Sequence, residues 1–177
     1  MKVTIAKGKP NGSLMAPPSK SFAHRYLIAA ALSCGTVTNL SYSDDVIASL
    51  NCLENLGATY EKQGNAVKFS GFAKISDVPT LDCNESGSTL RFFIPIAMTM
   101  FDNVVFKGTE KHISRGIEAY EECLAGVVTF SKDSNSIAAS GKLVPDNYVI
   151  DASKSSQYVS GLLIALSLLD GDSTLTI

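Results

Sequence analysis

The sequence lacks an excess of positive charge. Its 15 Lys and Arg residues are outnumbered by 17 Asp and Glu residues, and the formal net charge is −2. Proteins that bind nucleic acid or anionic membranes need a basic surface, so the composition argues against both kinds of partner. A local pocket for a small anion stays possible, because a few well-placed Lys and Arg residues are enough to build one.

The usual patterns of metal-binding, secreted and membrane proteins are also missing. The four cysteines form no CxxC pair and the two histidines do not fall at zinc spacing, so we expect no metal site and free thiols that serve mainly as small core residues. No secretion leader is visible, and the longest apolar run, residues 158–169, is too short and too interrupted to cross a membrane. The sequence therefore predicts a cytoplasmic, globular protein.

What the sequence does contain is a repeat. Three segments open with a serine-rich turn, continue as a long apolar helix, break at Gly or Asp, and enter a β-branched strand. Their first serines, Ser19, Ser86 and Ser153, are spaced 67 positions apart. Self-similarity at a fixed period is typical of stacked supersecondary units.

One unit is predicted to run β-α-β-α-β-β. In the first unit, residues 19–33 and 43–57 are predicted helices, and a hairpin follows that turns at Gly64 and Asn65. The second unit is predicted to have a shorter second helix over 114–126, and the third stops before its second helix. We expect units over about 16–75, 76–143 and 144–177, the last one incomplete, as in a fragment of a longer chain.

The predicted fold class is α/β. The units are expected to pack around a pseudo-threefold axis, with the long helices parallel and buried inside and the sheets outside. This arrangement would bring the starts of the three long helices to one region of the molecule.

The starts of the long helices are candidate anion sites. A helix N-terminus carries unpaired N–H groups and about half a positive charge, and cations accompany each of these turns. They are Lys20 and Arg25, then Arg91, then Lys154. For a single turn, a serine cap beside a surface cation is the ordinary interpretation, but three at a common period favour a binding site. His24 is expected at the surface or half-buried, with no catalytic role.

Residues 17–25, PPSKSFAHR, resemble the first signature of the 5-enolpyruvylshikimate-3-phosphate synthases. The segments SDDV, DCNESGSTLRFF, SRGIEAYEE and SSQYVSGLL follow in that family's order and spacing. The resemblance covers essentially all 177 residues but less than half of a full-length member, so the chain is similar to the N-terminal part of such an enzyme.

The resemblance implies an enolpyruvyl transferase-like fold and a reaction in chorismate biosynthesis. The enolpyruvyl group of phosphoenolpyruvate passes to the 5-hydroxyl of shikimate 3-phosphate, phosphate is released, and neither a metal nor an organic cofactor takes part. The C-terminal domain, which supplies an Asp and a Glu for proton transfer in the family, would be a further partner. By itself the chain is expected to be a partial, inactive enzyme.

The resemblance also implies roles for individual residues. Lys20 matches the catalytic lysine that contacts both substrates, while Asp45 has a supporting role and Arg91 a structural one. Phosphoenolpyruvate would bind at Lys20, Gly87 and Arg115. Shikimate 3-phosphate would bind at Lys20, Ser21, Arg25, Ser155, Ser156 and Gln157.

Two residues depart from the family pattern in the phosphoenolpyruvate half. Glu85 stands where the family often has Asn, and a carboxylate beside this anion is unfavourable unless it is paired or turned away. Gly116 stands where the family has a proline after the arginine. Residues 1–15 are expected to be a strand that belongs to the other domain, loosely held or packed differently in this chain, so the domain itself would span 16–177.

Two other functions are considered. A UDP-N-acetylglucosamine enolpyruvyl transferase would share the repeat, but it typically has Asn after the lysine, where this chain has Ser21. A non-catalytic binding or regulatory module that keeps the fold would explain why the sequence stops within a unit, and binding assays on the isolated chain would identify it.

Overall fold

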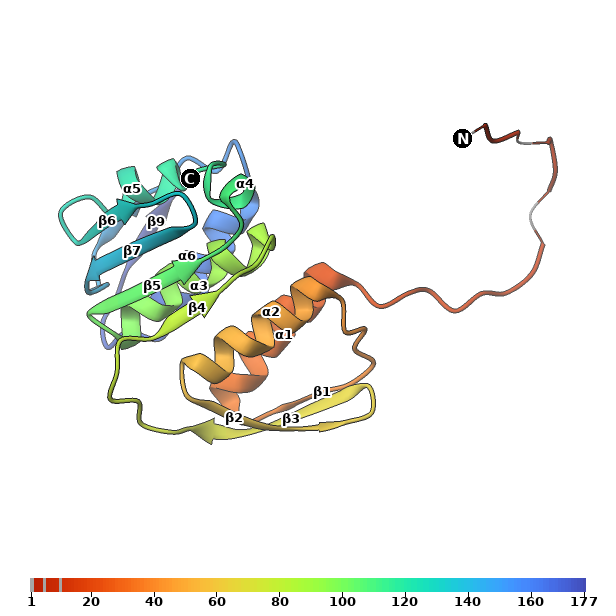
Figure 1. Cartoon of the computed structure of the whole chain (residues 1–177), viewed down its shortest axis with the longest axis horizontal. Helices are drawn as coiled ribbons and strands as arrows, with labels where there is room; N and C mark the ends of the chain where they lie inside the picture. Colours follow the sequence, from red (N-terminus) through yellow and green to blue (C-terminus); the bar gives the residue numbers. More distant parts are fainter. Residues whose placement is uncertain (1, 5, 10) are drawn as a thin grey trace.

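Two helices and a small antiparallel sheet form the first part of the chain (Figure 1). The computed structural model describes residues 2–4, 6–9 and 11–177. The elements of this part are α1 (Lys20–Ser33), β1 (Thr36–Val37), α2 (Asp44–Asn55), β2 (Ala58–Gln63) and β3 (Ala66–Phe72). The strand order is β1-β3-β2, and both helices pack on one face of the sheet. The predicted hairpin is confirmed, with Gly64 at a positive φ of 61° in its turn.

A four-stranded sheet and a long central helix form the second part. Its elements are β4 (Thr80–Asp82), α3 (Gly87–Met100), β5 (Asn103–Lys107), α4 (Glu110–Ile113), α5 (Glu118–Cys123), β6 (Val128–Lys132) and β7 (Ser136–Gly141). The strand order is β4-β5-β7-β6, in which β4 pairs in parallel with β5 and the other pairs are antiparallel. Helix α2 contacts both β4 and α3, so it joins the two parts.

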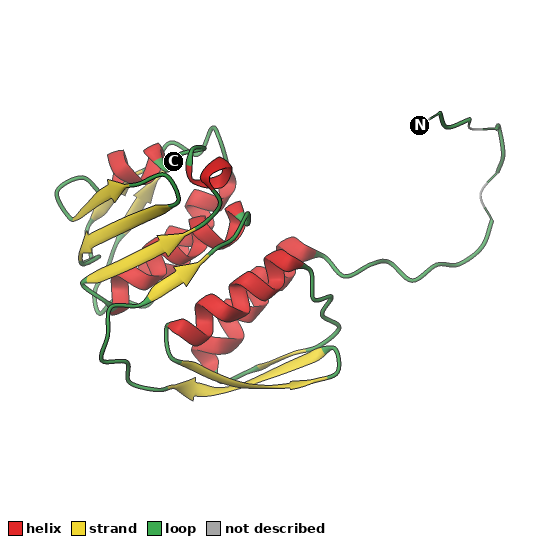
Figure 2. Cartoon of the chain, in the orientation of Figure 1, coloured by secondary structure: helices red, strands yellow, loops and turns green. Residues whose placement is uncertain are grey.

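The last part is a second parallel β-α-β crossover. It consists of β8 (Asn147–Val149), α6 (Ser156–Leu166) and β9 (Thr174–Thr176), with β8 and β9 paired in parallel. Helix α6 packs along α3 (Figure 2). The observed fold class is therefore α/β, as predicted.

Serine caps set the start of each long helix. Ser19 accepts a hydrogen bond from the backbone N–H of Phe22, Ser86 from Thr89, and Ser155 from Gln157. A cap of this kind pairs one of the N–H groups that the first helical turn leaves free. The predicted starts are confirmed for α1 and α3. The cap of α6 is Ser155, two residues later than Ser153, the position that the repeat period suggests.

The expectation of long helices buried on nearly all sides is correct only for α3. This helix buries Phe92, Phe93 and Ile94 completely, because sheet strands, α2 and α6 surround it. On α1, Phe22 and Tyr26 are 59% and 57% exposed, and Leu163 on α6 is 57% exposed. Both α1 and α6 therefore leave large apolar side chains exposed.

The predicted second helix of residues 114–126 is shorter than expected. Helix α4 lies before it and was not predicted, and α5 covers only Glu118–Cys123. Gly116 lies between them at φ +74°, where a Cβ atom would collide with the Glu118 carboxylate. This left-handed residue ends one helical turn and lets the next begin in another direction.

Proline inside α3 creates a specific link to α5. Pro95 has no N–H, so the carbonyl of Arg91 loses its helical donor. The hydroxyl of Tyr120 replaces that donor at 2.6 Å, and it also lies 3.1 Å from the carbonyl of Tyr158 on α6. Gly161 leaves room for this contact, since a Cβ there would lie 2.5 Å from the Tyr120 hydroxyl. Three helices are thereby locked together at one point.

Among the residues that the structure describes before α1, none belongs to a strand. Residues 2–4, 6–9 and 11–15 are exposed and run away from the helices and sheets (Figure 1). Residues 1, 5 and 10 of the predicted strand lie outside the described residues. That residues 1–15 belong to another domain stays a prediction.

The cysteines match the expectation of buried core thiols only in part. All four cysteines are free, with Cys52 and Cys83 buried, Cys123 half-buried and Cys34 exposed at the end of α1. Within the described ranges, no helix has both the length and the apolar character needed to cross a membrane. In the same residues, no group of three or more His, Cys, Asp or Glu side chains gathers where it could hold a metal ion.

Candidate active site

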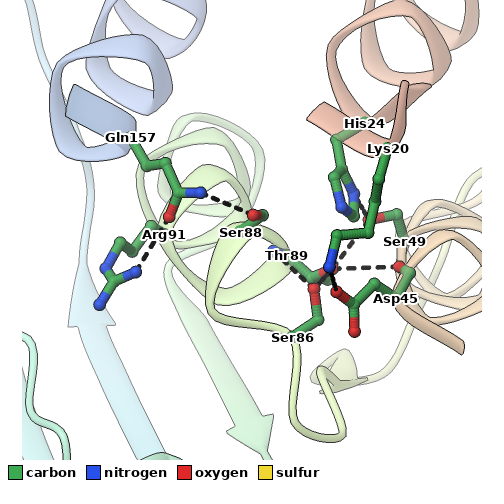
Figure 3. Close-up of polar contacts among 9 residues, drawn as sticks. All are labelled: Lys20, His24, Asp45, Ser49, Ser86, Ser88, Thr89, Arg91 and Gln157. Carbon is green, nitrogen blue, oxygen red and sulfur yellow. Dashed lines mark hydrogen bonds and ion pairs between the residues drawn. The ribbon is translucent and has the colours of Figure 1, made fainter. Parts of the chain in front are cut away.

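The first turn of α3 lies between the first turns of α1 and α6, which are far apart in the sequence. Figure 3 shows two groups of polar contacts on either side of this turn. One group joins it to α1 and α2, and the other joins it to α6. Two of the three predicted serine turns therefore flank the third.

Lys20 is held by Asp45 on the α1 side. Its Nζ lies 2.5 Å from Asp45 Oδ2, and the Lys20 side chain is still 54% exposed. Exposed pairs of this kind contribute about 0–1 kcal/mol, so an incoming phosphate or carboxylate can compete for the lysine. Asp45 orients the ammonium group without sequestering it.

A buried polar chain lies beneath this ion pair. His24 Nδ1 is 2.7 Å from Ser49 Oγ, Ser49 Oγ is 2.8 Å from Thr89 Oγ1, and Thr89 Oγ1 is 2.7 Å from Ser86 Oγ (Figure 3). These side chains come from α1, α2 and α3 and its cap. The chain fixes the distance between the starts of α1 and α3.

The expectation that His24 is at the surface or half-buried is wrong, because it is completely buried. Its Nε2 atom has no hydrogen-bond partner among the described residues. Burial lowers the pKa of His24 from 6.5 to about 4, with Asp45 opposing this change and Lys20 and Arg25 adding to it. The ring is therefore neutral at neutral pH. The only signal for its burial was its position on a helix that was expected to be buried.

Arg25 connects α1 to α6. Its Nη1 donates to the carbonyl of Ser21 at 2.9 Å, and its Nη2 donates to Ser160 Oγ at 3.0 Å. The guanidinium lies over the Phe92 ring, 4.9 Å from the centroid, which favours a cation. Arg25 therefore reaches back toward the first turn of α1.

Gln157 connects α6 to the start of α3. Its Oε1 accepts from Arg91 Nη1 at 2.9 Å, and its Nε2 donates to Ser88 Oγ at 2.7 Å (Figure 3). Ser155 caps α6, and Ser156 is exposed at its first position. The predicted triplet 155–157 therefore lies at a helix N-terminus beside the first turn of α3. Lys154, by contrast, pairs with Glu118 at 3.7 Å and points toward α5.

His112 on α4 braces the turn before Gly87. Its Nδ1 lies 2.8 Å from the carbonyl of Asn84, which also accepts from the Thr109 N–H at 3.2 Å. Gly108 permits this approach, since a Cβ there would lie 2.8 Å from the same oxygen. His112 was not predicted as a site residue, and its only signal was its position three residues before Arg115.

Charged groups surround His112 and therefore also the Gly87 turn. Burial lowers the pKa of His112, Arg115 and Arg91 lower it further, and the Asn84 carbonyl and Glu85 raise it. Arg115 itself is exposed. The predicted residues Gly87 and Arg115 thus share one neighbourhood with Arg91, which is suited to a small anion.

Glu85 is turned toward the cap of α4. Its Oε1 lies 3.4 Å from the Thr109 hydroxyl, which also caps α4 through the His112 N–H. The carboxylate that departs from the family pattern therefore has a hydroxyl partner.

The fold is similar to solved structures of enolpyruvyl transferases. EPSP synthase from Acinetobacter baumannii matches with a TM-score of 0.74 and 19% identity, over 93% of this chain and 40% of that one. The enolpyruvyl transferase NikO from Streptomyces tendae matches with a TM-score of 0.52 and 12% identity, over 87% of this chain and 38% of that one. At these identities the likeness concerns the fold.

The sequence is similar to curated 3-phosphoshikimate 1-carboxyvinyltransferases. The protein from Clostridium kluyveri is 37% identical over an alignment of 181 positions, which covers 99% of this chain and 42% of the relative. The protein from Clostridium beijerinckii is 39% identical over an alignment of 187 positions, which covers 98% of this chain and 43% of the relative. The chain thus spans less than half the length of these relatives. A sequence model of EPSP synthase (3-phosphoshikimate 1-carboxyvinyltransferase) matches residues 5–177, and the chain therefore belongs to the EPSP synthase family.

Proposed function

We propose that this chain is the N-terminal part of an enzyme that transfers the enolpyruvyl group from phosphoenolpyruvate to the 5-hydroxyl of shikimate 3-phosphate. The observation that carries the proposal is the meeting of three serine-capped helix starts with Lys20, Arg25 and Gln157 around them. Both substrates are anions, and positioned cations and helix ends offset their repulsion.

Shikimate 3-phosphate is assigned to the region between α1 and α6. Lys20 and Arg25 supply positive charge, and Ser21 supplies a hydroxyl at the start of α1. Ser155, Ser156 and Gln157 supply the hydroxyl and amide groups of α6. Arg25 supports this assignment, because it already spans the two helices through Ser21 and Ser160.

Phosphoenolpyruvate is assigned to Lys20, Gly87 and Arg115. A glycine at the start of α3 allows a ligand to approach the backbone N–H groups closely. Arg115 offers two parallel donors to a phosphate or carboxylate. Glu85 is accommodated by its contact with Thr109, which reduces its repulsion of the substrate.

Lys20 is the proposed catalytic residue. In addition–elimination at the enolpyruvyl carbon, charge develops near both substrates, and an ammonium group that contacts both stabilises it. Its pairing with Asp45 keeps it extended over the first turn of α3 before substrates arrive. The resemblance implies a reaction without a metal or organic cofactor.

The division of the chain into repeat units and its domain boundary are part of the same proposal. Units of about 16–75, 76–143 and 144–177 are arranged around a pseudo-threefold axis, and residues 1–15 belong to the other domain. The segment β4-α3-β5 and the segment β8-α6-β9 support this, because both are parallel crossovers. The C-terminal domain of the full-length enzyme is the expected partner, the chain alone is expected to be inactive, and the expected location is the cytoplasm.

The test is an amide NMR titration of this chain with shikimate 3-phosphate. We expect shifts concentrated at residues 20, 21 and 25 and at 155–157. UDP-N-acetylglucosamine serves as the control ligand and should produce no shifts there. A well-dispersed spectrum that responds to the UDP-sugar and not to shikimate 3-phosphate would contradict the proposal.

A further inference from the structure

The side-chain amide of Gln157 is held from both ends. Arg91 Nη1 donates to its carbonyl oxygen at 2.9 Å, and its nitrogen donates to Ser88 Oγ at 2.7 Å. Both partners belong to the first turn and a half of α3, whereas Gln157 belongs to α6 (Figure 3). The side-chain amide on α6 is therefore oriented by two side chains of α3.

The direction of this amide follows from the chemistry of its partners. A guanidinium group has only donors, so the group that faces Arg91 must be the carbonyl oxygen of Gln157. The NH₂ group must then lie on the opposite side, toward Ser88. One of its N–H groups binds Ser88, and the other has no protein acceptor in the part of the chain that the structure describes.

Arg91 is itself held firmly. Its guanidinium lies 5.1 Å from the centroid of the Tyr158 ring, and its backbone carbonyl accepts from the Tyr120 hydroxyl at 2.6 Å. Gly87 lies directly beside it, since a Cβ at that position would be 3.0 Å from Arg91 Nη1. Arg91 therefore lies between the turn assigned to one substrate and the glutamine assigned to the other.

We propose that Arg91 is a positioning residue that fixes Gln157 so that it offers an N–H donor, and not a carbonyl, to the ligand. The group recognised there is a hydrogen-bond acceptor, such as a phosphate, carboxylate or hydroxyl oxygen. This inference rests on the proposed function for the identity of the ligand, but the orientation of the amide does not depend on it. Arg91 thus has a role beyond the structural one that the sequence suggested.

The orientation can be measured in the chain without any ligand. The sequence contains two glutamines, Gln157 and Gln63, and Gln63 is exposed at the end of β2. Labelling the glutamine side-chain amides with ¹⁵N therefore gives two pairs of signals, one of which is an internal control. We expect the Gln157 pair to exchange with solvent at least tenfold more slowly than the Gln63 pair.

The decisive variants are Arg91→Met and Arg91→Lys. Methionine removes the donors, so the Gln157 signals should move to the positions and exchange rates of Gln63. Lysine can only donate, so it should retain part of the protection. Tyr120→Phe is the matched control, because it disturbs the same contact between α3 and α6 through the Arg91 backbone and leaves the guanidinium in place. It should leave the Gln157 signals near their original positions.

The inference is overturned if the Gln157 pair resembles Gln63 in the original chain, or if Arg91→Met leaves it unchanged. It is also overturned if Tyr120→Phe has the same effect as Arg91→Met, since a general loosening of the helices would then explain both. Each of these results is independent of ligand binding.

Adding shikimate 3-phosphate separates the inference from the proposed function. We expect the Gln157 amide signals to shift on titration and the Gln63 signals to stay in place, with about tenfold weaker binding for Arg91→Met. If the amide is ordered by Arg91 but no signal responds to shikimate 3-phosphate, the proposed ligand is wrong and the positioning role stands. If the ligand binds equally well to Arg91→Met, the positioning role for binding is wrong and the proposed function stands.

Discussion

The two sides of α3 are joined to their neighbours in different ways. Toward α6 the contact is close, with Gly161 against the Tyr120 hydroxyl and the Arg91 carbonyl, and with the Arg91 side chain on Tyr158. Toward α1 the contact depends on a buried chain of polar atoms from His24 to Ser86, and the outer face of α1 is open at Phe22 and Tyr26.

The difference indicates how each side serves the site. The α6 side is preorganised by packing, so changes there should act first on stability. The α1 side presents an exposed lysine on a polar support, so changes at its surface should act on binding, and changes in its buried chain should respond to pH.

The largest effect should be the loss of turnover caused by Lys20→Ala on the α1 side of α3. Loss of a charged contact to a developing or bound anion typically costs about 3–4 kcal/mol, or at least a hundredfold in turnover of the complete enzyme. Stability should change by less than about 1 kcal/mol, because the Lys20–Asp45 pair is exposed. Turnover of the complete enzyme measures the first effect, and urea unfolding measures the change in stability. Loss of folding in this variant would refute the active-site assignment.

The next effect is acid destabilisation through His24. Its pKa is 6.5 when unfolded and about 4 when folded, so between these values only the unfolded state takes up the proton. The contribution of His24 to the free energy of unfolding should be fully present above pH 6.5. About 3 kcal/mol of that free energy should be lost as the pH drops through 4.

The measurement is the free energy of urea unfolding at several pH values, with His24→Asn as the reference. Asparagine can still bond to Ser49 but does not titrate, so it should lose less stability over the same interval. Equal losses in both proteins would show that other groups cause the acid sensitivity.

A smaller loss of folding stability is expected for Gly161→Ala on the α6 side of α3. The new Cβ would lie 2.6 Å from the Arg91 carbonyl and 2.5 Å from the Tyr120 hydroxyl, so the helices must separate. Overpacking of this kind costs about 2 kcal/mol. Gly8→Ala is the control, because nothing lies within 4 Å of its Cβ position, and it should leave the urea midpoint unchanged.

The smallest effect distinguishes two serine caps. Ser86 is buried, and besides capping α3 its hydroxyl contacts Thr89 Oγ1 at 2.7 Å. Ser19 is exposed, and among the described residues its hydroxyl makes only the capping hydrogen bond from the Phe22 N–H, at 3.4 Å. Ser86→Ala should cost about 1–2 kcal/mol and Ser19→Ala about 0.5 kcal/mol by urea unfolding. A larger loss for Ser19 would show that the α1 cap, and not the buried chain, fixes this region.

Local features were predicted well from the sequence because their causes are local. A serine three residues before a helical N–H acts as a cap, and a Gly–Asn pair between alternating residues forms a hairpin turn. Helix α4 was missed because four residues carry too little periodicity to be recognised. The exposure of α1 was missed because it depends on what lies beside the helix.

The sequence alone therefore determined the α/β class, the starts of two of the three long helices, and the residue types that can bind anions. The tertiary structure decided that His24 is buried and neutral, that Tyr120 replaces the donor missing at Pro95, and that Arg91 orients Gln157. Each of these three contacts joins residues at least 25 positions apart. Such contacts form only when whole helices are brought together, so no local pattern of residues specifies them.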